Sequence, residues 1–122
     1  MQSIADLRAL CAELPHSRET FPFGETTLVF KVGPAGAGKI YALTDVQADP
    51  VSVSLKVRPD RGEELRAAHA AITPGYHLNK RHWVTVTLDG RVPPELIREL
   101  ISGSHALVVG GLTRAQRQDL VL

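Results

Sequence analysis

The sequence predicts a single domain of the α+β class, with helices packed on one face of an antiparallel β-sheet. Four segments alternate apolar and polar residues with the period of two expected of half-buried strands: 26–32, 39–44, 51–58 and 84–88. Three other segments repeat apolar residues at helical spacing: 4–14, 60–72 and 96–108. Short connections rich in glycine, proline and aspartate join the first three strands, which favours an antiparallel meander. With 122 residues, the chain suits one domain, residues 1–122, with its own core.

The first helix is predicted to begin after Ser3, whose side chain can cap it, and to end at Pro15. Its apolar stripe comprises Ile4, Leu7, Leu10, Cys11 and Leu14. The next segment, 19–24, places Phe21 and Phe23 on either side of a proline and ahead of a glycine. We therefore expect an extended loop that these two aromatic rings attach to the core.

The glycine-rich segment that follows the first strand has the glycine and lysine spacing of a phosphate-binding P-loop, with Lys39 as the lysine. A P-loop also needs Ser or Thr after the lysine, and a helix whose N-terminus faces the phosphates. Here Ile40 follows, and the pattern from 40 to 44 is that of a strand. The segment is therefore predicted to be the tip of a β-hairpin and not a nucleotide site.

The second half of the chain contains further helix signals. Asp60 and Glu63 have the spacing of a capping box, which predicts a helix over 60–72. After the strand at 84–88, the apolar stripe of the last long helix runs to two glycines at 110–111. Thr113 and Gln116 can cap one more short helix.

Composition excludes several classes of protein. At 43% hydrophobic and 22% charged residues, the chain has no apolar tract long enough to cross a bilayer, and its first residues do not resemble a secretory signal. We expect a cytoplasmic protein without membrane association. Its only cysteine, Cys11, cannot form an internal disulfide or a cysteine-based metal site. The formal net charge of +1 gives no strong overall field, so any binding of anions must be local.

The segment 73–83 is the densest in side chains that bind ligands. Its candidate binding residues are Tyr76, His77, Asn79, Lys80, Arg81, His82 and Trp83. The cations can neutralise phosphates, and the aromatic rings offer flat surfaces for bases or sugars. Asn79 could read a base edge or hold the loop. Three lysines from the middle of the chain could complete a basic face: Lys31, Lys39 and Lys56. A purely structural loop is the alternative interpretation.

The same segment does not suit a metal ion or an enzyme. It contains no cysteine or carboxylate, and the cations between its histidines would oppose a divalent ion. A histidine could act as a general base, but no nucleophile on a glycine-flanked turn and no spaced pair of carboxylates stands out elsewhere. We therefore expect a non-enzymatic protein with no metal and no cofactor.

The sequence also resembles a known family, the MmcQ/YjbR-like proteins. The likeness lies in Phe21-Pro22-Phe23-Gly24, Val29-Phe30-Lys31-Val32, Ser54-Leu55-Lys56, the run from Thr73 to Trp83, and Leu88-Asp89-Gly90. The resemblance covers nearly the whole chain, and the run from Thr73 to Trp83 is its most specific part. It implies a CyaY-like α+β fold and a double-wing arrangement that binds DNA, with the hairpin over 26–44 as one wing. A small anionic ligand, or an acidic segment of a protein partner, is the alternative.

Overall fold

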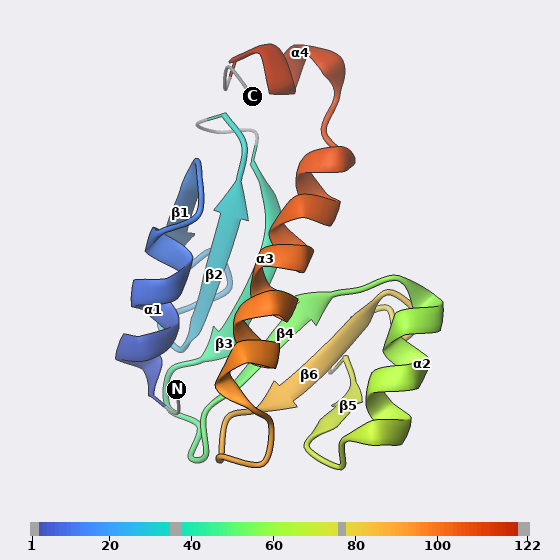
Figure 1. Ribbon diagram of the computed structural model, residues 1–122. Coiled ribbons are helices and arrows are strands. Elements are labelled where there is room, and N and C mark those ends of the chain that lie inside the picture. The colour runs from blue at the N-terminus through green and yellow to red at the C-terminus, as the bar shows by residue number, and fades with distance from the viewer. Residues whose placement is uncertain (1–2, 35–37, 76–77, 120–122) are drawn as a thin grey trace.

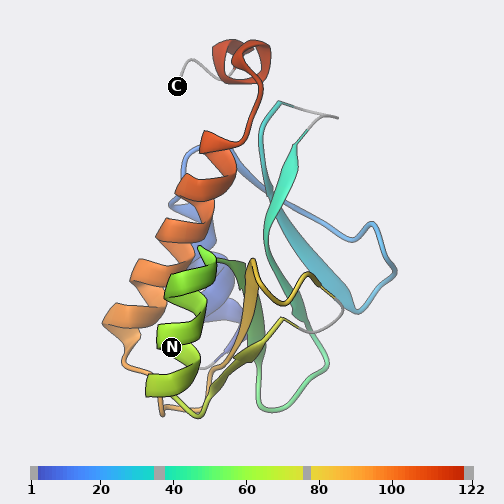
Figure 2. The same cartoon turned by 90° about the vertical axis from the view of Figure 1, so that its right-hand side faces the viewer.

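The computed structural model describes residues 3–34, 38–75 and 78–119 as a six-stranded antiparallel sheet with helices on one of its faces (Figure 1, Figure 2). The strand order is β1-β2-β3-β4-β6-β5. The elements, in chain order, are α1 (Ile4–Ala12), β1 (Ser17–Thr20), β2 (Thr27–Val32), β3 (Lys39–Asp45), β4 (Ser52–Lys56), α2 (Pro59–Ala68), β5 (Ile72–Pro74), β6 (Trp83–Thr87), α3 (Pro94–Gly110) and α4 (Arg114–Asp119). The predicted α+β class, with its antiparallel sheet, is confirmed.

The hydrophobic core lies between the sheet and the helices α1 and α3. Cross-strand partners share a face of a sheet, and one such row, Phe30, Ala42, Leu55 and Val84, is fully buried. From the other side, α1 and α3 contribute Leu7, Leu10, Cys11, Ile97, Leu100, Ile101 and Val108. Burying a large apolar side chain stabilises the fold by about 2 kcal/mol, so this layer accounts for most of the driving force. Among the described residues, no helix has the length and apolarity to cross a bilayer.

Most helix boundaries follow the predicted signals. The Ser3 side chain accepts a hydrogen bond from the backbone N–H of Asp6 at 3.1 Å. Ahead of α4, the Thr113 hydroxyl accepts from the N–H of Gln116 at 3.1 Å, and the Gln116 side chain accepts from the N–H of Thr113 at 2.9 Å. These reciprocal bonds form the predicted capping box.

The capping box predicted for α2 is wrong. This helix begins one residue earlier, at Pro59, after Arg58 as an N-cap without a side-chain hydrogen bond. Proline suits the first position of a helix because its missing N–H would have no partner there. The helix also ends at Ala68, and Ile72 belongs to β5, where it pairs with Val86. Pairing at the edge of the sheet therefore decides the structure of Ile72, although its spacing fits the preceding helix.

The edge strands β1 and β5 are not among the predicted strands. Ser17–Thr20 is polar throughout, so it lacks the alternation of apolar and polar residues that predicts a strand. Its backbone pairing with β2 makes it one. The expectation that Phe21 and Phe23 attach their loop to the core is wrong, because these rings are 48% and 67% exposed. In Figure 2, the loop between β1 and β2 projects on the side away from the helices.

The tip predicted between the first two strands does not form a P-loop. Lys39 is the first residue of β3, so a strand follows the glycines where a P-loop requires a helix. Residues 35–37 of the tip lie outside the described residues.

The sheet divides between β3 and β4. These two strands pair directly only at Ala42 with Leu55 and at Leu43 with Ser54. One step further along, the buried hydroxyl of Ser104 accepts from the N–H of Lys56 at 2.8 Å and donates to the carbonyl oxygen of Tyr41 at 2.6 Å. A side chain of α3 thus links the two strands where direct pairing stops, and beyond it they diverge (Figure 1).

Replacing Ser104 by alanine is expected to lower the free energy of unfolding by about 2 kcal/mol, because a buried N–H and a carbonyl oxygen both lose their partner. Urea denaturation measures this change. Ser102→Ala is the matched control, since Ser102 is exposed on the same helix and its replacement should shift stability by less than about 0.5 kcal/mol. Equal effects of the two substitutions would contradict the bridging role of Ser104.

A buried polar cluster joins α1 to the sheet. Tyr41 is fully buried, and its hydroxyl shares a short hydrogen bond with Ser17. Burial raises the pKa of Cys11 to about 11, and a hydrogen bond with Tyr41 partly opposes that change. Burial also raises the pKa of Tyr41 above its ordinary value. Both groups are therefore neutral in the folded protein at physiological pH.

This cluster predicts a loss of stability at alkaline pH. Between the ordinary pKa of a cysteine, near 9, and its folded value of about 11, the unfolded chain binds fewer protons than the folded one. The free energy of unfolding should therefore fall as pH rises through this window, by about 1 kcal/mol per pH unit from Cys11 alone. Urea denaturation from pH 8 to 11 should show a shallower decline for Cys11→Ala. Parallel declines would contradict the assignment to this thiol.

Candidate functional site

The segment with the highest density of candidate residues forms the hairpin loop between β5 and β6. The N–H of Gly75 donates to the carbonyl oxygen of Trp83 at 3.0 Å, closing the base of the loop. The N–H of Val57 donates to the carbonyl oxygen of His82 at 2.8 Å. The second bond attaches the loop to the end of β4, one residue beyond Lys56. The loop is therefore held beside the division in the sheet.

Asn79 shapes this loop. Its side-chain oxygen accepts from the N–H of Arg81 at 2.9 Å, which is an Asx turn, and its backbone carbonyl accepts from the N–H of His82 at 3.2 Å. The side-chain oxygen of Asn79 is thus engaged within the loop. This geometry supports the second of the two roles predicted for Asn79, that of holding the loop.

The loop presents its cations to solvent. Lys80, Arg81 and His82 are exposed, and neither Lys80 nor Arg81 forms an ion pair with another described residue. Tyr76 and His77, which complete the predicted set in this segment, lie outside the described residues. Exposed cations without carboxylate partners leave their charge available to an anion.

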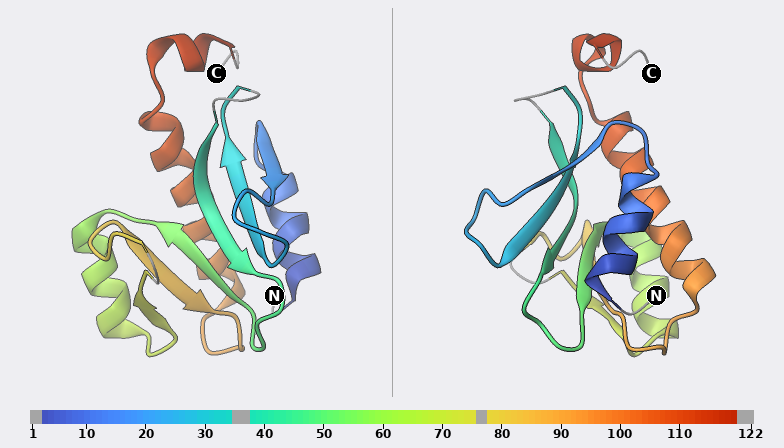
Figure 3. Two further views of the ribbon diagram at one scale, coloured as in Figure 1. Left: turned by 180° about the vertical axis from the view of Figure 1, so that it is seen from behind. Right: turned by 90° about the vertical axis from the view of Figure 1, so that its left-hand side faces the viewer.

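The left view of Figure 3 shows the sheet from behind, on the face without helices. The strand register places a row of cations on this face. Register pairs Arg18 with Lys31 and Lys31 with Ile40 in one half of the sheet, and Lys56 with Trp83 in the other. Since Phe30, Leu55 and Val84 face the helices, these neighbours face the opposite side. We call Arg18, Lys31, Lys56 and Trp83 the basic row.

A cleft of about 450 Å³ opens where β3 and β4 diverge, and Val108 and Gly111 at the end of α3 contribute to its wall. Its lining includes Lys31, Lys39, Lys56 and Trp83. The structure therefore brings together the three predicted lysines of the sheet and one end of the predicted loop. Trp83 is half-buried, so it serves both the sheet and the cleft wall.

Lys39 and Arg18 also have structural partners. The Lys39 ammonium donates to the carbonyl oxygen of Gly111 at 3.0 Å, which places a cation at the C-terminus of α3, where the helix dipole favours it. Arg18 donates through Nη2 to the carbonyl oxygen of Pro34 at 2.8 Å, whereas its solvent-inaccessible Nε has no hydrogen-bond partner among the described residues. Arg18 is absent from the predicted site, because only the unpredicted pairing of β1 with β2 brings it beside Lys31.

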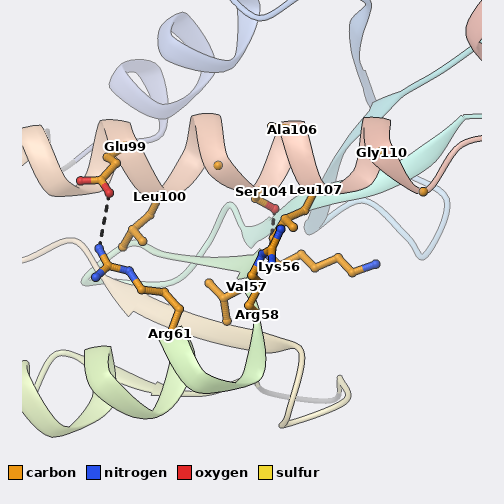
Figure 4. Close-up of a pocket in the computed structure, with 12 residues that line it drawn as sticks. Lys56, Val57, Arg58, Arg61, Glu99, Leu100, Ser104, Ala106, Leu107 and Gly110 are labelled. Carbon is orange, nitrogen blue, oxygen red and sulfur yellow. Dashed lines mark hydrogen bonds and ion pairs between the residues drawn. The ribbon is translucent and has the colours of Figure 1, made fainter.

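A larger groove, of about 740 Å³, lies between α3 and the corner joining β4 to α2 (Figure 4). Its cations are Lys56, Arg58 and Arg61, and its apolar side chains include Leu100 and Leu107. Arg61 forms ion pairs with Glu99 at 3.4 Å and with Glu64 at 3.8 Å, which reduces its effective charge. In Figure 4, Lys56 extends away from the Arg61–Glu99 pair.

The described residues contain no group of three His, Cys, Asp or Glu side chains placed to hold a metal ion. His105 is largely buried, makes an edge contact with the Tyr41 ring, and shares a hydrogen bond with the carbonyl oxygen of Pro15 at 2.8 Å. This histidine therefore has a packing role in the core.

The model of the YjbR family matches residues 12–107 of the chain, which include the whole sheet and nearly all of α3. The chain belongs to the YjbR family. The predicted resemblance is thereby confirmed.

Relatives and solved structures extend this assignment. The uncharacterised protein YbdF of Escherichia coli O157:H7 is 34% identical over 111 residues, covering 91% of this chain and 88% of its own length. The uncharacterised protein YjbR of Escherichia coli K12 is 38% identical over 82 residues, 67% of this chain and 70% of its own. A crystal structure of Deinococcus radiodurans protein DR2400 superimposes with a TM-score of 0.95 at 61% identity, covering 100% of this chain and 90% of that one. A Pseudomonas syringae protein gives 0.73 at 26% identity, covering 87% and 98%.

The close packing at the base of the loop between β5 and β6 predicts that stability depends strongly on glycine at position 75. A Cβ atom there would lie 2.6 Å from the Cβ of Trp83 and 3.1 Å from its carbonyl oxygen, so the backbone of the hairpin would have to shift. Gly75→Ala should lower the free energy of unfolding by about 2 kcal/mol in urea denaturation.

Gly103→Ala is the matched control, because a Cβ there meets no atom within 4 Å and the residue lies inside α3. This substitution should raise stability by about 0.5–1 kcal/mol, as alanine favours the helix. A Gly75→Ala protein as stable as the native one would contradict the close packing of the loop base.

Proposed function

We propose that this protein binds DNA without catalysing a reaction, and that it contacts phosphates through the basic row and the loop cations. One observation carries the proposal: Lys31 and Lys56, far apart in the sequence, meet at one cleft whose wall includes Trp83, and Arg18 lies beside Lys31 on the neighbouring strand. Cations that converge on one surface neutralise several phosphates at once, and the release of counterions then favours binding.

The loop supports the same function. Lys80 and Arg81 are exposed on the segment that is hydrogen-bonded to the end of β4, beside Lys56. The Asx turn at Asn79 orders the backbone that carries them, so less conformational entropy is lost when they bind a phosphate. Trp83 offers a flat ring at the same cleft for a sugar or a base. This function fits the cytoplasmic location expected from the sequence.

The distribution of acidic residues favours an anion at the cleft. Three glutamates form ion pairs with arginines on the helix side: Glu19 with Arg8, Glu13 with Arg98, and Glu99 with Arg61. No described residue that lines the cleft carries a carboxylate, whereas Lys31, Lys39 and Lys56 line it, so the cleft has a local excess of cations although the net charge of the chain is only +1. Binding through such a local patch depends strongly on salt.

The groove of Figure 4 supports a second candidate function, the binding of a small anion or of an acidic segment of a protein partner. Arg58 lines it, and among the described residues this arginine forms no ion pair, while Leu100 and Leu107 supply apolar surface. Under this alternative, Arg58→Gln would weaken binding of the anion or acidic segment, and Lys31→Gln would not.

The DNA proposal predicts that Lys31→Gln and Lys80→Gln each weaken binding to duplex and single-stranded DNA of any sequence. Each should reduce the slope of log affinity against log salt by about one unit, because each removes about one phosphate contact. Fluorescence anisotropy at several salt concentrations gives this slope. Arg98→Gln is the control: it removes the same charge from an exposed residue on the helix side, and the slope should not change. Absence of binding at low salt, or equal slopes in all variants, would refute the proposal.

A further inference from the structure

A second hollow, of about 550 Å³, differs in chemical character from the cleft lined by Lys31, Lys39 and Lys56, which we call the basic cleft. Its apolar lining consists of Phe23, Ile40, Leu43 and Leu78, and the hydroxyl residues Ser54 and Thr85 also line it. These two hydroxyl oxygens lie 2.9 Å apart and share a hydrogen bond. Apolar walls above a few polar groups are typical of sites that hold a planar organic ring. We call this hollow the ring pocket.

The ring pocket adjoins the basic cleft. Ile40 lines both hollows, and in the sheet it is the cross-strand partner of Lys31. On β4, Ser54 of the pocket and Lys56 of the cleft are two residues apart and point to the same face. On β6, Thr85 and Trp83 are related in the same way. A single ligand can therefore occupy both hollows across adjacent residues of these strands.

The charges of the two hollows are opposed. Asp45, at the far end of β3 from the lysines, also lines the ring pocket and accepts a hydrogen bond from the N–H of Gln47 at 2.9 Å. A carboxylate there repels a phosphate, whereas Lys31 and Lys56 attract one. The ligand that fits has an uncharged ring with polar edges at one end and an anionic group at the other. A nucleotide has this arrangement.

The walls favour an unpaired base. Phe23 is 67% exposed although it is a large apolar side chain, and it stands at the rim where a base can stack on it. Bases within a duplex are stacked and paired, so their faces are not free to enter a pocket. We infer, on the basis of the proposed DNA-binding function, that the ring pocket takes one unpaired base of single-stranded DNA while Arg18, Lys31 and Lys56 hold the flanking phosphates.

The test compares three labelled DNA ligands of equal length by fluorescence anisotropy: a thymidine strand, an abasic strand and a duplex. The thymidine strand should bind about tenfold more tightly than the abasic strand, because the loss of a stacked base forfeits most of the pocket contacts. Phe23→Ala should remove most of this advantage and leave binding of the abasic strand unchanged. Phe21→Ala is the matched control, since Phe21 is exposed on the same loop but does not line the pocket.

The outcomes separate this inference from the proposed function. Equal affinity for the three ligands, together with equal effects of Phe23→Ala and Phe21→Ala on that affinity, would overturn the base-binding pocket. Phosphate binding would still stand. No binding of any ligand at low salt would overturn both. Thymidine monophosphate should compete only weakly, because it lacks the neighbouring phosphates. Competition as strong as that of the strand would overturn the assignment to single-stranded DNA in favour of a free nucleotide.

Discussion

The hydroxyl of Ser104, inserted between β3 and β4, is the contact on which the shape of the proposed binding face depends. A continuous ladder would bond the two strands directly, but here the N–H of Lys56 and the carbonyl oxygen of Tyr41 both bind this hydroxyl. The backbone groups stay satisfied, so the strands can separate without the cost of unpaired buried polar atoms. The separation produces the cleft in which Lys31, Lys39 and Lys56 meet.

Two cations near the cleft, Lys39 and Arg18, are positioned by contacts that leave part of their charge available. Lys39 binds the last turn of α3 through the carbonyl oxygen of Gly111, and Arg18 binds the carbonyl oxygen of Pro34. Both partners are neutral carbonyls and not carboxylates, so the positive charge is not neutralised. On the helix side, in contrast, Arg8 and Arg98 face Glu19 and Glu13. These two arginines are therefore neutralised by carboxylates, whereas Lys39 and Arg18 keep their charge.

The loop between β5 and β6 combines structural and binding roles in neighbouring residues. Gly75, Asn79 and Trp83 hold its backbone through close packing, an Asx turn and the base of the hairpin. Lys80 and Arg81, between these positions, are exposed. The segment is dense in unusual residues for two reasons: some of them order the backbone of the loop, and others carry the exposed charge. An ordered backbone holds the cations in place for binding.

Elements whose signals are local could be predicted from the sequence. Alternation over 26–32, 39–44 and 84–88, the cap at Ser3 and the box of Thr113 and Gln116 depend on residues close in the chain, and the α+β class follows from them. The sequence also singled out the lysines of the sheet as candidates. The strand β1, in contrast, depends on tertiary contacts, since its four residues are polar and are ordered by pairing with β2. That pairing places Arg18 beside Lys31. Likewise, the exposure of Phe23 and the insertion of Ser104 between two strands arise from contacts across the sheet, which no local pattern encodes.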